Sequence, residues 1–212
     1  EDGSPVIIKT LGVSGMAEWK ELELFERGIG VLRGLDHPGV PRHLGDGQFV
    51  RGGETFHFWV QQRVEGRSLA AGLEQGQRWT EARALAEGML EILEYLQGFS
   101  PPIVHRDLKP SNILERPDGS WVLIDFDLVK DTLEPEGGAT TALGTAGYAP
   151  LEQLMGRAVM ASDLYGLGAT LVAVLSRKDP ADLLDTDAGR IEFREHVRIS
   201  EPFAAFIERL LE

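Results

Sequence analysis

The sequence predicts an α+β fold with two lobes, a small β-rich lobe followed by a larger helical lobe. Segments rich in β-branched and aromatic residues flank one helix-like stretch in residues 1–65. Helical periodicity dominates from Ser68 onward, and the chain contains no internal repeat or low-complexity tract. We therefore expect the two lobes to meet in a short connection between Val64 and Arg67.

The small lobe is expected to contain strands around one helix. The segment PVIIK at residues 5–9 predicts the first strand, and residues 17–35 predict the helix. The turn-forming sequence RGGE precedes FHFWVQQRV at residues 56–64, which predicts a further strand. This order of elements fits a small β-rich lobe with a single covering helix.

The larger lobe is expected to begin with an amphipathic helix. Thr80 can cap this helix, and its apolar residues recur at helical spacing: Leu85, Met89, Ile92, Leu93 and Leu96. A hairpin follows, in which residues 112–114 and 121–124 flank the turn PDGS. The Gly- and Thr-rich residues 134–147 predict a loop. The apolar run Leu164–Leu175 predicts a buried helix, because about 12 residues are too few to span a bilayer.

Composition narrows the classes of function. The 212 residues carry a formal charge of -13, whereas nucleic-acid-binding domains are basic, so we expect no nucleic-acid partner. The chain has no cysteine, which excludes disulfides and thiolate metal sites and fits a reducing compartment. The sequence contains no signal peptide and no membrane segment, so we expect a cytoplasmic protein.

The strongest local signal is the motif VHRDLKPSNIL, with LIDFD a few residues beyond it. Together the two motifs offer Asp107, Asn112 and Asp125, which are two carboxylates and an amide. A carboxylate can accept the proton of an attacking hydroxyl, and Mg²⁺ prefers oxygen ligands, so this set suits phosphoryl transfer from a nucleotide. The alternative is structural, with Asp107 in a turn, Asp125 capping a strand end and His105 packed in the core.

These motifs resemble those of the protein kinase family, and more closely those of the eukaryotic-like Ser/Thr kinases of bacteria. The resemblance extends over nearly the whole chain. It implies a kinase-like two-lobed fold, ATP and Mg²⁺ as cofactors, and a protein carrying Ser or Thr as the substrate. The segment VIIK resembles the family's third strand, which implies that Lys9 holds the α- and β-phosphates. The alternative for Lys9 is an ordinary exposed strand lysine.

The segment WVQQRVEGRSL resembles the family's fifth strand and the hinge between the lobes. This resemblance implies that Gln61 is the gatekeeper and that the backbones of Gln62 and Val64 face the adenine. Without the motifs further along the chain, Gln61 and Gln62 would be interpreted as solvated residues of a sheet edge.

In the larger lobe the resemblance assigns four site residues. It implies that Asp107 is the catalytic base, that Lys109 contacts the γ-phosphate, and that Asn112 and Asp125 are metal ligands. A lysine at position 109 is typical of the Ser/Thr type of catalytic loop.

Two further segments resemble parts of the family's larger lobe. The segment GTAGYAPLEQ resembles the substrate-docking loop, with Thr145 near the catalytic base and Glu152 in the place of the family's Ala-Pro-Glu acid. The segment SDLYGLG resembles the central buried helix, in which Asp163 supports the backbone of the catalytic loop. The alternative for Asp163 is an acid favoured by the dipole at a helix N-terminus.

Three features depart from the family pattern. The family's helix glutamate that pairs with the strand-three lysine lies nine residues before His37, and Gly28 occupies that position here. Neither Glu21 nor Glu26 is an obvious substitute. Asp127 stands where the family's Asp-Phe-Gly has glycine. The first two strands, their Gly-rich loop and the final helices are expected to be missing, so the chain resembles a kinase domain cut at both ends.

Three functions are compatible with these observations. We expect residues 1–66 to form a partial N-lobe and residues 67–212 a C-lobe, which together act as a Ser/Thr protein kinase. The alternative is a pseudokinase or scaffold module with a degraded nucleotide site, which Gly28 and Asp127 favour. A small-molecule phosphotransferase is the third hypothesis, but the docking loop suits a polypeptide substrate.

Overall fold

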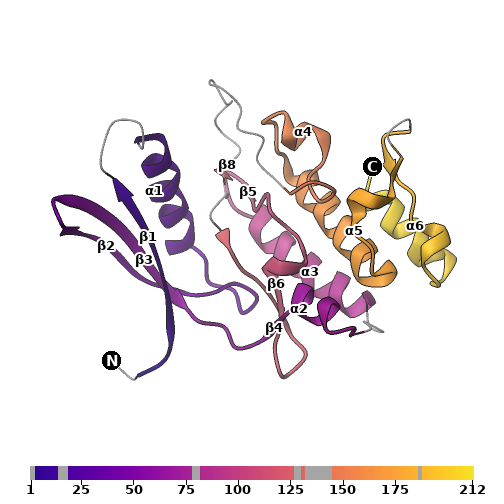
Figure 1. Cartoon of the computed structure of the whole chain (residues 1–212), viewed down its shortest axis with the longest axis horizontal. Coiled ribbons are helices and arrows are strands. Elements are labelled where there is room, and N and C mark those ends of the chain that lie inside the picture. Colours follow the sequence, from indigo (N-terminus) through magenta and orange to yellow (C-terminus); the bar gives the residue numbers. More distant parts are fainter. Residues whose placement is uncertain (1–2, 14–18, 78–81, 127–129, 132–144, 186–187) are drawn as a thin grey trace.

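The computed structural model describes residues 3–13, 19–77, 82–126, 130–131, 145–185 and 188–212. A sheet covered by one helix forms one end of the molecule, and a mainly helical part forms the other (Figure 1). The predicted α+β architecture with a small sheet-containing lobe and a helical lobe is confirmed.

The small lobe is an antiparallel three-stranded sheet in the order β1-β3-β2, covered by helix α1. Its elements are β1 (Val6–Val13), α1 (Trp19–Arg33), β2 (His43–Arg51) and β3 (Glu54–Gln62). β2 and β3 form a hairpin around Gly52 and Gly53, whose φ values of 65° and 85° suit glycine. The sequence predicted β1, α1 and β3 but not β2, because Gly45 and Gly47 weaken its strand pattern.

The larger lobe follows a four-residue connection and contains short strands among helices. Its first half comprises β4 (Arg67–Ser68), α2 (Leu69–Glu74), α3 (Ala82–Gln97), β5 (Ile103–Val104), a 3₁₀ turn (Pro110–Asn112), β6 (Ile113–Glu115), β7 (Trp121–Leu123) and β8 (Lys130–Asp131). Its second half comprises α4 (Leu151–Leu154), α5 (Met160–Ser176), β9 (Leu184–Asp185), β10 (Arg190–Ile191) and α6 (Glu201–Leu210), with 3₁₀ turns at Pro180–Leu183 and Arg194–His196.

Helices α3 and α5 form the centre of the larger lobe. The apolar residues predicted for one face of α3 are all buried, so this amphipathic helix is confirmed, whereas Thr80 lies outside the described residues. The α5 residues from Gly166 to Val174 are all buried, as expected for a helix surrounded by protein. Among the described helices, none combines the length and the apolarity that a membrane span requires.

The β6–β7 hairpin positions two of the predicted site residues. The predicted hairpin is confirmed, and in it Ile113 pairs with Leu123. The N–H of Ile124 donates to the carbonyl oxygen of Asn112 at 2.8 Å. Asn112 directly precedes β6, and Asp125 follows the end of β7. Both residues therefore lie at the open end of the hairpin. Of the predicted loop 134–147, only residues 145–147 are among those described.

Candidate active site

The segment from His105 to Asn112 connects β5 to β6, and a carboxylate of helix α5 binds its backbone. The carboxylate of Asp163 accepts the backbone N–H of His105 at 2.7 Å and that of Arg106 at 2.8 Å. Arg106 has a φ of 70°, which is uncommon for a residue with a side chain. These two hydrogen bonds therefore stabilise a turn that the backbone would otherwise disfavour, as the sequence resemblance implied for Asp163.

His105 links the same segment to the strand end that carries Asp125. Its Nδ1 accepts the N–H of Asp107 at 3.3 Å, so Nε2 carries the proton and donates to the carbonyl oxygen of Ile124 at 3.1 Å. The ring also packs edge-on against Phe126, with centroids 4.8 Å apart. Burial lowers the pKa of His105 to about 4, which keeps the ring neutral at pH 7. His105 is therefore packed in the core, as the structural alternative in the sequence analysis predicted for this residue.

The structure brings three polar side chains together around the carboxylate of Asp107. Asn112 Nδ2 donates to Asp107 Oδ2 at 2.9 Å, and Lys109 Nζ lies 2.8 Å from the same oxygen. Thr145 Oγ1 donates to Asp107 Oδ1 at 3.0 Å and accepts from Lys109 Nζ at 2.8 Å. Asp107, Lys109 and Asn112, which the sequence singled out, are thus direct neighbours, with Thr145 beside them.

Replacing Thr145 with valine tests how far this hydroxyl contributes to the arrangement. The variant loses hydrogen bonds to a carboxylate and an ammonium. If the site transfers a phosphoryl group, as the sequence resemblance implies, we expect the transfer rate to fall about tenfold, a loss of about 1.5 kcal/mol. The fold should be unaffected, because valine has nearly the same volume. The measurement is the transfer rate beside that of Thr10→Val, an exposed β1 position that should change the rate less than twofold.

Lys9 reaches the site from the small lobe. Its ammonium forms an ion pair with Asp125 Oδ1, although the two residues lie 116 positions apart in the sequence. It also lies 5.6 Å from the ring centroid of Trp59, its register partner on β3. Lys9 is thus a part-buried residue of the site, and the alternative of an ordinary exposed strand lysine is wrong.

Helix α1 faces the site at Gly28, where the family has its glutamate. A Cβ at this position would lie 3.7 Å from the carbonyl oxygen of Phe126, which is ordinary contact distance. Helix α1 therefore approaches the backbone of Phe126, the residue after Asp125, but at position 28 it presents hydrogen instead of a carboxylate. Glu26 lies on another side of the helix, with its Oε1 3.5 Å from His57 Nδ1, so it does not replace the missing acid. The side chain of Glu21 lies outside the described residues.

The three residues expected near the adenine lie at the end of β3 and just beyond it. Gln61 is buried and accepts a hydrogen bond from Trp59 Nε1 at 3.3 Å, so its interpretation as a solvated edge residue is wrong. Gln62 is exposed, and its N–H donates to the carbonyl oxygen of Arg42 at 2.8 Å. Val64 is half-buried in the connection between the lobes.

Two polar contacts in helix α4 and its surroundings were not predicted. Gln153 is buried, and its Nε2 donates to the carbonyl oxygen of Arg106 at 2.5 Å. Glu152 Oε1 accepts from Ser162 Oγ at 3.2 Å, at the start of α5. No spacing signal joins Gln153 to a backbone carbonyl 47 positions earlier, so sequence reasoning had no means of finding it. Asp127 lies outside the described residues.

Comparison with known proteins identifies the family. The sequence profile described as "Protein kinase domain" matches residues 1–212, and the chain belongs to this family. Serine/threonine-protein kinase B of Synechocystis sp. is 35% identical over 204 residues, which cover 90% of this chain and 34% of that protein. Serine/threonine-protein kinase PknA of Nostoc sp. is 39% identical over 168 residues, covering 74% of this chain and 29% of that protein.

A third relative matches almost the whole chain. Serine/threonine-protein kinase F of Synechocystis sp. is 31% identical over 224 residues, covering 97% of this chain and 45% of that protein. The resemblance to bacterial Ser/Thr kinases, stated from the motifs, is confirmed. The chain spans less than half the length of each of these three relatives.

Proposed function

We propose that this chain transfers the γ-phosphate of ATP to a Ser or Thr hydroxyl of a protein. The observation that carries the proposal is the hydrogen bond of 3.0 Å between Thr145 Oγ1 and Asp107 Oδ1. It supports the proposal because a threonine hydroxyl already fits against this carboxylate at the distance that proton transfer requires. An acceptor hydroxyl at the same carboxylate would be oriented, and its proton accepted, by Asp107.

The charges around Asp107 support the same assignment. Phosphoryl transfer depends mainly on positioning and on neutralising negative charge, and little covalent chemistry is left to the protein. Lys109, whose ammonium lies 2.8 Å from Asp107, is the proposed contact to the γ-phosphate. Lys9 is the proposed contact to the α- and β-phosphates. These phosphates would compete with Asp125 for the Lys9 ammonium. Gln62 and Val64 are the proposed backbone contacts to the adenine.

A magnesium ion fits the residues at the end of the β6–β7 hairpin. Asn112 Nδ2 donates to Asp107, so its amide oxygen Oδ1, which accepts from Ser111 Oγ at 3.3 Å, is the atom that can bind a metal, and Asp125 adds a carboxylate. Both are hard oxygen donors of the kind that Mg²⁺ prefers, with water and phosphate oxygens completing its coordination. When bound, Mg²⁺ would neutralise charge on the phosphates. We propose Asn112 and Asp125 as its ligands.

The two lobes have separate parts in this proposal. Residues 1–66 would supply Lys9 and the adenine contacts, and residues 67–212 would supply the acceptor and metal site.

The acidic composition argues against a nucleic-acid partner, and the absence of cysteine fits the cytoplasm.

A pseudokinase is the second candidate, and two features of the site favour it. Lys9 is paired with Asp125, the proposed metal ligand, and helix α1 offers glycine at position 28 where the family has an acid. A site of this kind could bind ATP without turning it over.

The test is incubation of the chain with Mg²⁺, γ-labelled ATP and either a protein acceptor or a small alcohol. We expect label on serine or threonine of the protein, identified by mass spectrometry, and no label when EDTA removes Mg²⁺. ATP binding without transfer would select the pseudokinase, and label on the small alcohol alone would select a small-molecule phosphotransferase.

A further inference from the structure

The position of the Lys9 ammonium needs an explanation, because a lysine side chain has four flexible bonds and helix α1 offers no carboxylate at Gly28. Among the described residues, Asp125 contacts the ammonium by an ion pair through its Oδ1. The face of Trp59 also contacts it, and the ring centroid lies 5.6 Å from Lys9 Nζ. A distance below about 6 Å is within the range at which an ammonium is attracted to an aromatic face.

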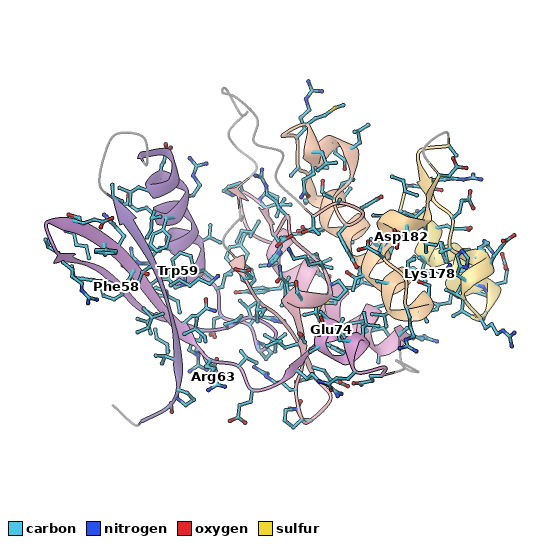
Figure 2. The ribbon with its side chains drawn as sticks, in the orientation of Figure 1. Phe58, Trp59, Arg63, Glu74, Lys178 and Asp182 are labelled. Carbon is cyan, nitrogen blue, oxygen red and sulfur yellow. The ribbon has the colours of Figure 1, made fainter. Side chains whose placement is uncertain are left out.

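The indole of Trp59 is itself fixed from several directions. Trp59 is 1% exposed and lies on the side of the sheet that α1 covers (Figure 2). Phe25 of α1 packs on the indole with ring centroids 4.5 Å apart. The Nε1 of Trp59 donates to Gln61 Oε1 at 3.3 Å. The backbone register places it directly opposite Lys9 on the neighbouring strand. The ring is therefore a rigid surface with one face available to the ammonium.

We propose that Trp59 is a positioning residue for Lys9, and that the contact from Phe25 through Trp59 to Lys9 couples the lysine to helix α1, which has glycine where the family has its glutamate. The inference rests on the proposed function, in which Lys9 contacts the nucleotide phosphates. Trp59 acts through Lys9 and touches no substrate.

Asp125 and Trp59 differ in what a bound nucleotide would require of them. Asp125 is one of the two proposed metal ligands, so its carboxylate would be shared between the metal and the Lys9 ammonium. The indole of Trp59 binds no metal and carries no charge, so it keeps its place and does not neutralise Lys9. An aromatic face thus holds the ammonium while leaving its full positive charge for the phosphates.

A double-mutant cycle on equilibrium binding of Mg-ATP, measured by calorimetry, tests whether Trp59 acts through Lys9. The proteins are the unmodified chain, Trp59→Leu, Lys9→Met and the double variant. We expect Trp59→Leu to weaken binding about 2- to 30-fold, and the double variant to bind no more weakly than Lys9→Met alone. Losses that add in the double variant would overturn the proposal, because they would mean that Trp59 supports the fold independently of Lys9.

A second readout needs no nucleotide. An ammonium that is no longer held against the indole is more accessible to a reagent in solution, so removal of the indole should expose the Lys9 amine. We expect acetylation of Lys9, followed by mass spectrometry relative to exposed Lys178, to accelerate several-fold in Trp59→Leu. An unchanged ratio would overturn the inference. Failure of the unmodified chain to bind ATP would instead contradict the proposed function, and the acetylation ratio would still decide the contact.

Two further variants control for loss of structure. Trp59→Phe keeps an aromatic face, so its Mg-ATP affinity and its rate of Lys9 acetylation should lie between those of the unmodified chain and of Trp59→Leu. If Trp59→Leu shows no cooperative thermal transition, Trp59→Phe takes its place in both measurements. Trp121→Leu removes an indole from β7 in the other lobe and should leave Lys9 acetylation unchanged within twofold. A Trp59→Phe variant as impaired as Trp59→Leu would contradict a role for the aromatic face.

Discussion

Replacing Asp107 with asparagine is expected to lower the rate of phosphoryl transfer by about 10²- to 10⁴-fold, the usual contribution of a general base. Asparagine has nearly the same shape and can still accept a hydrogen bond from Thr145. It carries no charge, so it can neither accept the proton of an acceptor hydroxyl nor hold Lys109, whose ammonium lies 2.8 Å away. The measurement is the transfer rate at saturating Mg-ATP.

ATP affinity should change much less than the rate in this variant, because Asp107 is proposed to contact the acceptor and not the nucleotide. The matched control is Asp118→Asn, the same substitution in the exposed β6–β7 turn, where Asp118 accepts only from Ser120 among the contacts described. This control should retain the full rate within twofold. A rate in Asp107→Asn equal to that of Asp118→Asn would remove Asp107 from the mechanism.

Replacing Asp163 with alanine is expected to lower the free energy of unfolding by about 2–5 kcal/mol. The variant leaves the buried N–H groups of His105 and Arg106 without their acceptor, and each such group costs about 1–3 kcal/mol. Because whole domains are stable by only about 5–15 kcal/mol, this is a large fraction of the total. Denaturant unfolding gives the free energy directly.

The same variant should also lose activity, because Asp107 follows immediately after the two anchored residues. A displacement of about 1 Å in a catalytic group can cost about 10²-fold in rate. Asp182→Ala is the matched control at an exposed position (Figure 2), and we expect a change in stability of less than about 0.5 kcal/mol. Equal stability of the two variants would show that the Asp163 hydrogen bonds contribute nothing to the fold.

Asp163 and His105 also predict how stability depends on pH. Burial raises the pKa of Asp163 to about 6, above its unfolded value, so its contribution is present in full below about pH 4 and is lost as the pH rises through 6. Burial lowers the pKa of His105 to about 4, so its contribution is present above about pH 6.5 and is lost as the pH falls toward 4. Between pH 4 and 6 the two contributions have opposite slopes.

The Asp163→Asn variant separates these contributions. Asparagine does not titrate, so only the His105 slope remains, and we expect the variant to lose more stability than the unmodified chain between pH 6 and pH 4. Chemical denaturation at several pH values measures both slopes, and the other carboxylates affect both proteins alike. A variant with the same slope, or a shallower one, would show that the pKa of Asp163 is not raised in the folded state.

Local sequence patterns predicted most of the elements because their signals are short-range. Helix α3 and the β6–β7 hairpin follow from apolar spacing and a Pro-Asp-Gly turn, and both are confirmed. The strand β2 was missed, since its two glycines hide the pattern that tertiary pairing with β3 enforces. The motif singled out Asp107 and Asn112, and the family resemblance added Lys109. The three lie together because all belong to one short segment.

Contacts between distant segments could not be predicted in the same way. The sequence indicated that Gly28 stands where the family has its helix acid, but not that Asp125 and Trp59 would contact the Lys9 ammonium. Both contacts depend on how the small lobe, helix α1 and the β6–β7 hairpin pack, and no local pattern encodes that packing. The hydrogen bond from Gln153 to the backbone of Arg106 is hidden from the sequence for the same reason.

The most direct test of the central claim is a single-turnover experiment with the chain in excess over γ-labelled Mg-ATP and a protein acceptor present. It observes the chemical step without the later release of products. We expect label to move from ATP to serine or threonine of the acceptor in the unmodified chain, and at least about 10²-fold more slowly in Asp107→Asn. ATP that is bound by the folded chain but recovered intact would contradict the claim.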